Sequence, residues 1–436
     1  MQWASSIAKH YVVILMLTFA PFPASAYEPA TIAQLEQVLA AAHGKPDKAL
    51  AKQLGDLELT ERLSTLRLEK LQASVPGEKS RQALLVLSDL SAFRDLPADE
   101  IPQLAVPDSE AQGRILNKVT DYIRQALPRQ IDIVVTRNTV HFDNLKVVSF
   151  NHSGASAEWA KTKTEVELEA TPSVVPLSAA AVVENQPYHF IEKTSDTINY
   201  RNGAEEVAGL PPAEHRQIPP QSGLNNWGVF GPLLEIVVND ISGGGAQWAH
   251  WEQGTRNTMA VFRYDVPADQ SNYNVQYCCF ISGKTWDSSG DERWNVYESL
   301  LPSYHGEIAV DPESGEILRL TIQTVIPDGQ PIYEAEFLVE YGPVELGGRE
   351  YLLPSRSVTI SVAPVPVMVQ EGHCVDRSCV HGLFAHPKDT VVRDTVYTSY
   401  HAFRGDTRIL PGDGSDAGVG STSSPQPKVR APRRKP

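Results

Sequence analysis

Two cysteines and two histidines lie close together near the C-terminal end of the sequence. The segment reads His373-Cys374-Val-Asp-Arg-Ser-Cys379-Val-His381, with four residues between the cysteines. Thiolates and imidazoles are the ligands that zinc prefers in proteins. His373, Cys374, Cys379 and His381 are therefore candidate metal ligands.

A disulfide between Cys374 and Cys379 is the favoured interpretation of the same segment. The N-terminal residues, described below, predict export, and closely spaced thiols usually pair in an oxidising compartment. Closing so short a ring contributes about 2 kcal/mol by the loop-entropy relation. We expect no cofactor, and zinc stays the alternative. Cys278 and Cys279 are adjacent, and four cysteines allow three pairings, so their connectivity is left open.

The second concentration of unusual residues is Trp248-Ala-His250-Trp251-Glu252. On a regular strand, Trp248, His250 and Glu252 share one face and Trp251 lies on the other. Such a face can hold an acyl chain or a sugar ring, so Trp248, His250 and Trp251 are candidate ligand-binding residues. The alternative is that these residues pack in the core, with His250 and Glu252 as a cross-strand pair.

No catalytic motif stands out in the sequence. The chain lacks G-x-S-x-G, H-E-x-x-H and a Walker loop. Its 53 acidic residues are too numerous for a pair of carboxylates to be chosen without geometry. No catalytic residue is therefore predicted.

The first 26 residues have the features of a secretory signal. Lys9 precedes an apolar stretch, and Ala24-Ser25-Ala26 supplies a small-residue cleavage site. The apolar stretch is too short to span a bilayer, so we expect a secreted or periplasmic chain that does not cross the membrane. The net charge of −15 argues against nucleic acid as a partner, because phosphate contacts need a positive surface.

Residues 27–130 predict a small helical domain, because apolar residues recur every three or four positions behind helix-capping residues. The predicted helix starts are Thr31, which forms a capping box with Gln34, then Thr60, Ser80 and Asp108. Each helix has one narrow apolar face, so the helices must pack on each other or on a neighbouring sheet.

Residues 131–404 predict an antiparallel β domain, since the period changes to two and β-branched and aromatic residues dominate. The predicted strands are 131–135, 165–169, 197–200, 260–264, 273–280, 306–310, 317–324, 333–341, 351–362 and 391–403. Short turns join most of them, which requires antiparallel pairing. Residues 405–436, rich in Gly, Ser and Pro, predict a disordered tail. The fold class is α+β: a helical domain, a curved antiparallel sheet and a tail.

Five segments carry a resemblance that spans most of the chain: Leu59–Ser64, Trp251–Gly254, Ala260–Val266, Asp311–Leu320 and Tyr341–Arg349. Through them the chain resembles a group of uncharacterised secreted bacterial proteins, to which no function is attached. In strand order and turn spacing, residues 196–403 are distantly similar to the half-barrel of lipoprotein-carrier proteins. That resemblance implies an antiparallel sheet curled around an apolar cavity that takes acyl chains, and it assigns no binding residue.

We therefore expect an exported, non-catalytic binding or scaffolding protein whose curved sheet holds a hydrophobic ligand or a partner segment. One alternative is a secreted hydrolase, either metal-assisted or built on carboxylates. Its site would contain His373, Cys374, Cys379 and His381, or else His250 and Glu252. The other alternative is an interaction module whose helical domain docks another envelope protein.

Overall fold

Helices, with two short strands among them, come first along the described part of the chain, and strands, with one helix among them, follow. The structure is a computed structural model that describes residues 27–125, 131–149, 176–177, 181–209, 223–224, 227–280, 295–328, 330, 332–364, 368–370, 381–383 and 388–402. The helices are α1 (Ile32–Ala41), α2 (Asp47–Gly55), α3 (Thr65–Gln72), α4 (Glu78–Ser91), the short 3-10 helix η1 (Ala98–Glu100), α5 (Ser109–Gln125) and α7 (Pro232–Ile241). The predicted signal peptide, the strand at 165–169 and the C-terminal tail lie outside the described residues.

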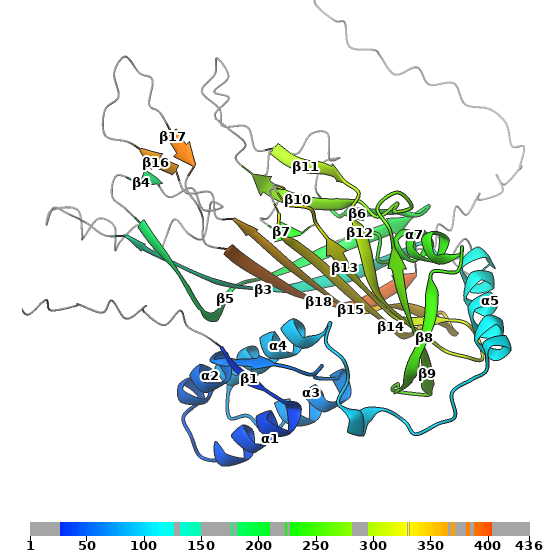
Figure 1. Cartoon of the computed structure of the whole chain (residues 1–436), viewed down its shortest axis with the longest axis horizontal. Helices are drawn as coiled ribbons and strands as arrows, with labels where there is room; N and C mark the ends of the chain where they lie inside the picture. Colours follow the sequence, from blue (N-terminus) through cyan, green and yellow to red (C-terminus); the bar gives the residue numbers. More distant parts are fainter. Residues whose placement is uncertain are drawn as a thin grey trace, which may run out of the picture. The chain divides into compact units, whose positions relative to one another are not determined.

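The helices α1 to α4 form one group, with the short parallel strands β1 (Glu28–Ala30) and β2 (Leu57–Leu59) between them (Figure 1). We call residues 28–91 the helical segment. Its own core consists of apolar residues from each element, including Leu35, Leu54 and Leu84, all essentially unexposed. Each helix alone has too narrow an apolar face to be stable, so burial against its neighbours holds it in place.

The capping box at the start of α1 is confirmed. The Thr31 hydroxyl accepts a hydrogen bond from the Gln34 backbone N–H at 3.2 Å, and the Gln34 side chain accepts one from the Thr31 N–H at 2.8 Å. Asp108 is also confirmed as a helix start, because its carboxylate accepts from the Ala111 N–H at 2.7 Å. These caps satisfy backbone donors that a helix start leaves without partners.

Two predicted helix starts are wrong, because contacts distant in sequence take over their roles. The Thr60 N–H bonds to the Ala30 carbonyl at 3.0 Å in continuation of the β1–β2 pair, and Ser64 caps α3 instead. Ser80 lies inside α4, where Asp47 accepts its backbone N–H at 2.9 Å. The cap of α4 thus comes from a residue at the start of α2.

The main sheet has ten strands in the order β6-β5-β3-β18-β15-β14-β13-β12-β9-β8, and it is open at both edges. Its strands are β3 (Ile133–Ser149), β5 (Ala181–Arg201), β6 (Ala204–Val207), β8 (Ala246–Gln253), β9 (Thr258–Val266), β12 (Ser303–Val310), β13 (Ile317–Val325), β14 (Glu334–Leu346), β15 (Arg349–Pro364) and β18 (Lys388–Ala402). Every neighbouring pair is antiparallel. The chain is therefore α+β with a curved antiparallel sheet, as the change of period predicts.

Besides the β1–β2 pair, the described residues form two small three-stranded sheets. One three-stranded sheet has the order β11-β10-β7, from Asn295–Leu300, Val275–Phe280 and Gly223–Leu224. The other has the order β17-β16-β4, from His381–Leu383, Met368–Gln370 and Pro176–Leu177. Among the described residues, no helix combines the length and the apolar character that crossing a bilayer requires.

One face of the sheet, which we call the core face, is covered by α5 and α7. On β9, Ala260, Phe262 and Tyr264 point to this face and are at most 3% exposed. Ile115 and Val119 of α5 and five apolar residues of α7, Leu233, Leu234, Val237, Val238 and Ile241, join the same cluster. Helix α7 was not predicted from the sequence, although Pro232 at its first position and the spacing of Leu233, Val237 and Ile241 are helix signals.

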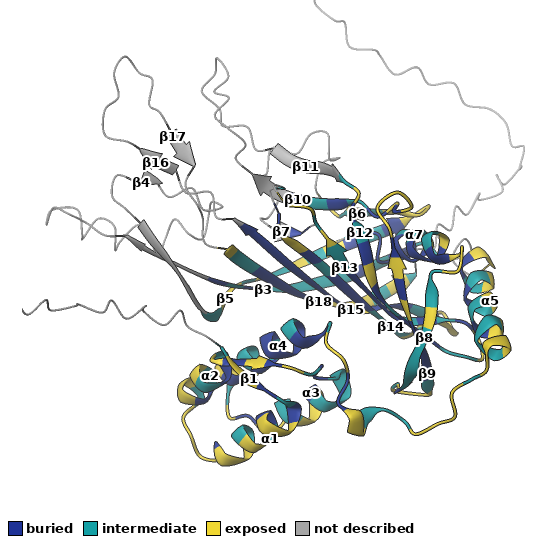
Figure 2. Cartoon of the chain, in the orientation of Figure 1, coloured by how far each residue is buried: buried dark blue, intermediate teal, exposed yellow. Residues whose placement is uncertain are grey.

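The opposite face, which we call the charged face, contacts the helical segment. Phe142, Leu338, Val358 and neighbouring apolar residues pack against Val86 of the helical segment and against Ala92, which directly follows α4. Much of the rest of this face is polar: charged side chains stand in cross-strand rows, such as Arg319, Glu340 and Arg356 on β13, β14 and β15. Figure 2 shows the central strands as largely buried, whereas α1 and α5 carry exposed residues along one side.

Candidate functional site

A buried network of charges joins the helical segment to the charged face. Arg62, which follows β2, places a guanidinium nitrogen 2.5 Å from one Glu252 oxygen on β8. Arg319 on β13 bonds both oxygens of Glu252, one of them at 2.8 Å. Glu307 on β12 lies 3.3 Å from Arg319 and 3.6 Å from Arg62. We call these four residues the Glu252 network.

The electrostatics of this network hold Glu252 in its ionised form. Burial opposes ionisation, but the charges of Arg319 and Arg62 outweigh it and keep the pKa of the Glu252 carboxyl well below its ordinary value. Both oxygens already accept hydrogen bonds from guanidinium groups. A carboxylate held in this way is a poor proton acceptor, so Glu252 is positioned to bind arginines rather than to act as a general base.

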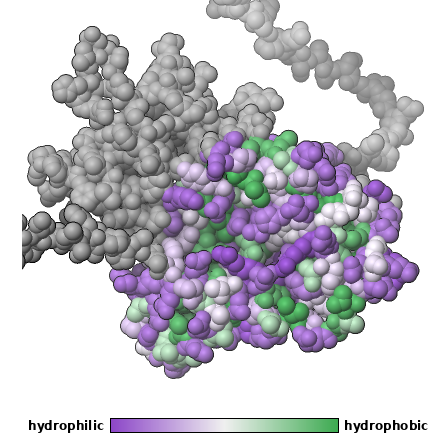
Figure 3. Space-filling view, in the orientation of Figure 1, coloured by the Kyte–Doolittle hydropathy of each residue, from purple (hydrophilic) through white to green (hydrophobic). Residues whose placement is uncertain are grey.

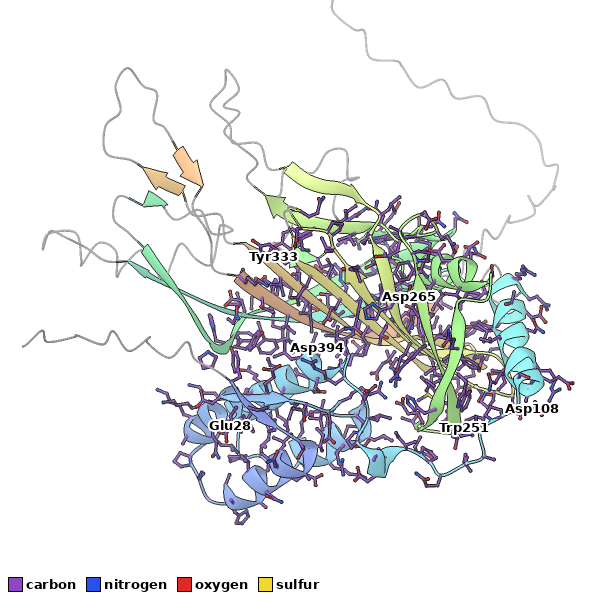
Figure 4. The ribbon with its side chains drawn as sticks, in the orientation of Figure 1. Glu28, Asp108, Trp251, Asp265, Tyr333 and Asp394 are labelled. Carbon is purple, nitrogen blue, oxygen red and sulfur yellow. The ribbon has the colours of Figure 1, made fainter. Side chains whose placement is uncertain are left out.

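A second buried network surrounds Arg356 on β15. Its guanidinium group bonds Asp394 on β18 at 2.9 Å and Asp89 on α4, and it lies 4.0 Å from Glu340. Burial raises the pKa of the Asp89 carboxyl well above its ordinary value, and the negative charge of Asp394 adds to this rise. Figure 4 labels Asp394, which faces α4 from the sheet.

Two hollows border these networks on the charged face. The first, the α4 pocket, has a volume of about 430 Å³. It lies between residues 92–95, just after α4, and the polar side chains Gln247, Arg263, Asp265, His305, Glu307 and Gln323 of four adjacent strands. It adjoins the Glu252 network through Glu307.

The second hollow, the α3 groove, has a volume of about 600 Å³. It runs from residues 62–66 and Glu69 of the helical segment across the ends of β8 and β9 to β13, β14 and β15. Both volumes lie within the range of small-ligand sites, roughly 300–1,000 Å³. The space-filling view in Figure 3 shows hydrophilic residues over much of the described surface, with small apolar areas between them.

The walls of the α3 groove carry charges of both signs with an acidic excess. Its arginines are Arg62, Arg256, Arg319 and Arg356, and its acidic residues are Glu69, Glu252, Asp311, Glu316, Glu340 and Glu350. Each arginine already has a carboxylate partner, as in the exposed two-point pair of Arg256 with Glu350 at 2.7 and 2.9 Å. Glu69 and Glu316 have no arginine partner among the described residues.

The predicted alternation of β8 is wrong, because a bulge at Ala249 interrupts it. Trp248 pairs with Phe262 and His250 with Val261, so Ala249 is the extra residue on β8. The bulge brings Trp248 and Trp251 to the same face, with their ring centroids 4.8 Å apart.

The bulge therefore separates the predicted ligand-binding residues. Trp248 and Trp251 pack against the core face, and the Trp251 indole N–H donates to the Ala105 carbonyl at 2.8 Å. His250 lies on the charged face, where its Nε2 is 3.5 Å from Glu252. A shared binding role for Trp248, His250 and Trp251 stays a prediction.

The cysteine-histidine segment lies almost wholly outside the described residues. His373, Cys374 and Cys379 are not described, and His381 is the first residue of β17. The predicted disulfide and the alternative zinc site therefore stay predictions. Among the described residues, no cluster of three or more His, Cys, Asp or Glu side chains is arranged to hold a metal ion.

Arg62, Arg319 and Glu307 were not predicted from the sequence, and Glu252 was predicted only as a partner of His250. Arg62 and Glu252 are 190 positions apart, so no local pattern links them. The one available signal was a charged or polar residue at alternate positions of an apolar strand, as at Arg319 and Thr321 between Leu318, Leu320 and Ile322. Comparison with known proteins gives no match to a family model, to a curated protein or to a solved structure.

Proposed function

We propose that this chain is an exported, non-catalytic binding protein whose α3 groove holds an extended segment of a protein partner. The observation that carries the proposal is the groove itself: an open channel of about 600 Å³ with charged walls, between the helical segment and the sheet. The core face does not serve this purpose, because α5 and α7 cover it with buried apolar side chains.

The chemistry of the groove supports binding rather than catalysis. Glu252 is ionised and fully engaged by two arginines, and His250 lies beside it on the same face. The apolar side chains of Met259, Leu318 and Leu338 line the groove between the charged residues. Such a surface offers apolar contact area and charge-assisted hydrogen bonds, the combination that recognises peptides.

The acidic excess of the walls predicts the charge of the partner. Six acidic residues and four arginines line the groove, and the arginines are already paired. A segment with lysine or arginine side chains can pair with Glu69 and Glu316 at the rim, whereas an acidic segment is repelled.

Binding of fluorescent peptides to the full chain without residues 1–26 tests the proposal. The peptides are unstructured, share one apolar pattern and carry a net charge of +3, 0 or −3. We expect the basic peptide to bind at least about tenfold more tightly than the acidic one, a difference of about 1.4 kcal/mol.

A pair of variants locates the binding. Glu69→Lys combined with Glu316→Lys reverses two groove charges that form no ion pair with an arginine among the described residues, and it should weaken binding of the basic peptide at least about tenfold. Glu206→Lys, at an exposed position of β6, makes the same charge reversal at one residue outside the groove. It should change the dissociation constant of the basic peptide by less than about twofold. Equal losses from both changes, or binding of lipid but of no peptide, would refute the proposal.

A further inference from the structure

The α4 pocket is a second binding candidate, separate from the α3 groove. Two cross-strand rows of polar side chains form its floor. In the first row Gln247 and Glu307 flank Arg263, and in the second Asp265 and Gln323 flank His305. Side chains directly opposite each other on neighbouring strands lie about 5 Å apart, so these rows present polar groups at short, regular intervals.

Three of these side chains are available to a ligand. Gln247, Asp265 and His305 are exposed and form no hydrogen bond or ion pair with other described residues. The others are engaged: Arg263 pairs with Asp95 and, at 3.2 Å, with Glu307, and the Gln323 amide donates to Glu336 at 2.8 Å. The available side chains therefore lie beside neighbours on adjacent strands whose polar groups already have partners.

The available groups combine donors and acceptors. An amide offers both, an ionised carboxylate accepts, and an imidazole has one nitrogen of each kind when neutral. A ligand that matches them needs several groups that both donate and accept, which is the property of hydroxyls. Phe93 lines the opposite wall and is partly buried, so its ring offers an apolar surface beside the polar floor.

The charges of the pocket exclude other ligand classes. Arg94 and Arg263 face Asp95, Asp265 and Glu307, so the lining has no positive excess that would attract a phosphate or sulfate group. The polar floor equally disfavours an acyl chain, because burying such groups without hydrogen bonds costs free energy.

We propose that the α4 pocket binds a neutral saccharide, with Gln247, Asp265 and His305 bonding its hydroxyls and Phe93 contacting the apolar face of a sugar ring. The site does not depend on the α3 groove, because the side chains available to a ligand in the two hollows are different residues, although both hollows are lined by parts of β8, β9 and β13. A failure of peptide binding in the groove therefore leaves this proposal standing.

Titration calorimetry of the full chain without residues 1–26 tests the proposal with defined probes. The neutral probes are the trisaccharides of β-linked N-acetylglucosamine, β-linked glucose and α-linked glucose, and the anionic probe is a sulfated disaccharide. We expect at least one neutral trisaccharide to bind with a Kd below about 1 mM and the sulfated disaccharide to bind at least about tenfold more weakly.

Substitutions locate the saccharide in the pocket. Asp265→Ala and His305→Ala remove exposed side chains and should each weaken binding about tenfold without lowering the melting temperature by more than about 2 °C. Asp269→Ala, an exposed position in the turn after β9, is the matched control and should bind like the unchanged chain. Both pocket variants should keep the peptide binding of the α3 groove.

Two results would overturn the proposal. One is the absence of binding for every neutral trisaccharide at saccharide concentrations up to about 10 mM, while the chain still melts cooperatively. The other is unchanged saccharide affinity in both Asp265→Ala and His305→Ala, which would place any binding elsewhere.

Discussion

The two faces of the sheet are stabilised in different ways. The core face is closed by α5 and α7 through apolar burial, with Phe262, Val237 and Leu320 fully buried. The charged face joins the helical segment through the small apolar cluster around Val358 and through the networks of Glu252 and Arg356. Apolar burial is non-directional and fills space, whereas ion pairs need defined geometry and leave hollows between them. The face held by charges is therefore the one with room for ligands.

The largest expected effect is the loss of a core-face ring. Phe262→Ala removes a fully buried side chain from the cluster beneath α7, and it should lower the free energy of unfolding by about 4 kcal/mol. Chemical denaturation measures this change. Gln247→Ala, an exposed position on neighbouring β8, is the control and should cost less than about 0.5 kcal/mol. Similar costs for both variants would contradict the assignment of stability to the core face.

Neutralising Glu252 should have the next largest effect. Glu252→Gln leaves Arg62 and Arg319 buried with no full counter-charge, which should cost about 3 kcal/mol. Hydrogen exchange should show α4 losing protection before β13, because the network ties the helical segment to the sheet.

The exposed pair of Arg256 and Glu350 provides the matched control. Glu350→Gln breaks a two-point ion pair of similar geometry that is exposed to solvent, so it should leave the free energy of unfolding almost unchanged. Equal costs at Glu252 and Glu350 would show that burial of the network contributes nothing.

The pH dependence of stability should reveal Glu205, which adjoins the start of α7. Burial raises the pKa of its carboxyl from an ordinary value near 4.5 to about 7. Because the folded-state pKa is the higher one, ionisation opposes folding, and the stability present below pH 4.5 is lost as the pH rises through 7. Since the side chain is partly exposed, we expect a loss of roughly 1–2 kcal/mol between pH 5 and pH 8.

Glu205→Gln should remove that part of the pH dependence. Thermal melting of the variant and of the unchanged chain between pH 5 and pH 8 gives the difference curve, and Glu206→Gln on the exposed side of β6 is the control. The expected direction would be contradicted if the two chains showed the same pH dependence. It would also be contradicted if the unchanged chain gained stability relative to Glu205→Gln as the pH rises.

The smallest effect concerns the cap of α5. Asp108→Ala removes the acceptor of the Ala111 N–H and should cost about 1 kcal/mol, whereas Asp108→Ser should restore most of the loss. Hydrogen exchange at the first turn of α5 measures the change directly. If Asp108→Ser is as unstable as Asp108→Ala, the capping bond is not the cause.

Local patterns predicted much of the fold. Alternation on β9 correctly placed Ala260, Phe262 and Tyr264 on one face, and the capping pattern correctly began α1 at Thr31. The errors occur where a distant contact supersedes a local preference, as when β1 pairs with β2 beside Thr60.

The candidate site was far less predictable than the fold. The ion pairs of Glu252 come from Arg62 and Arg319, which lie elsewhere in the chain, and no local periodicity in the sequence predicts these contacts. The two hollows arise from the gap between an apolar contact and two ion-pair networks. Such a gap is a property of the packed structure, so a sequence pattern cannot contain it.

The extra residue in β8 makes this strand sensitive to its length. Because Ala249 has no pairing partner on β9, Trp248 and Trp251 both pack on the core face while Glu252 lies on the charged face beside its arginines. Deleting Ala249 would rotate one half of the strand relative to the other and direct either the indoles or the carboxylate to the wrong side. An insertion or deletion at this position would therefore disconnect the two layers at once.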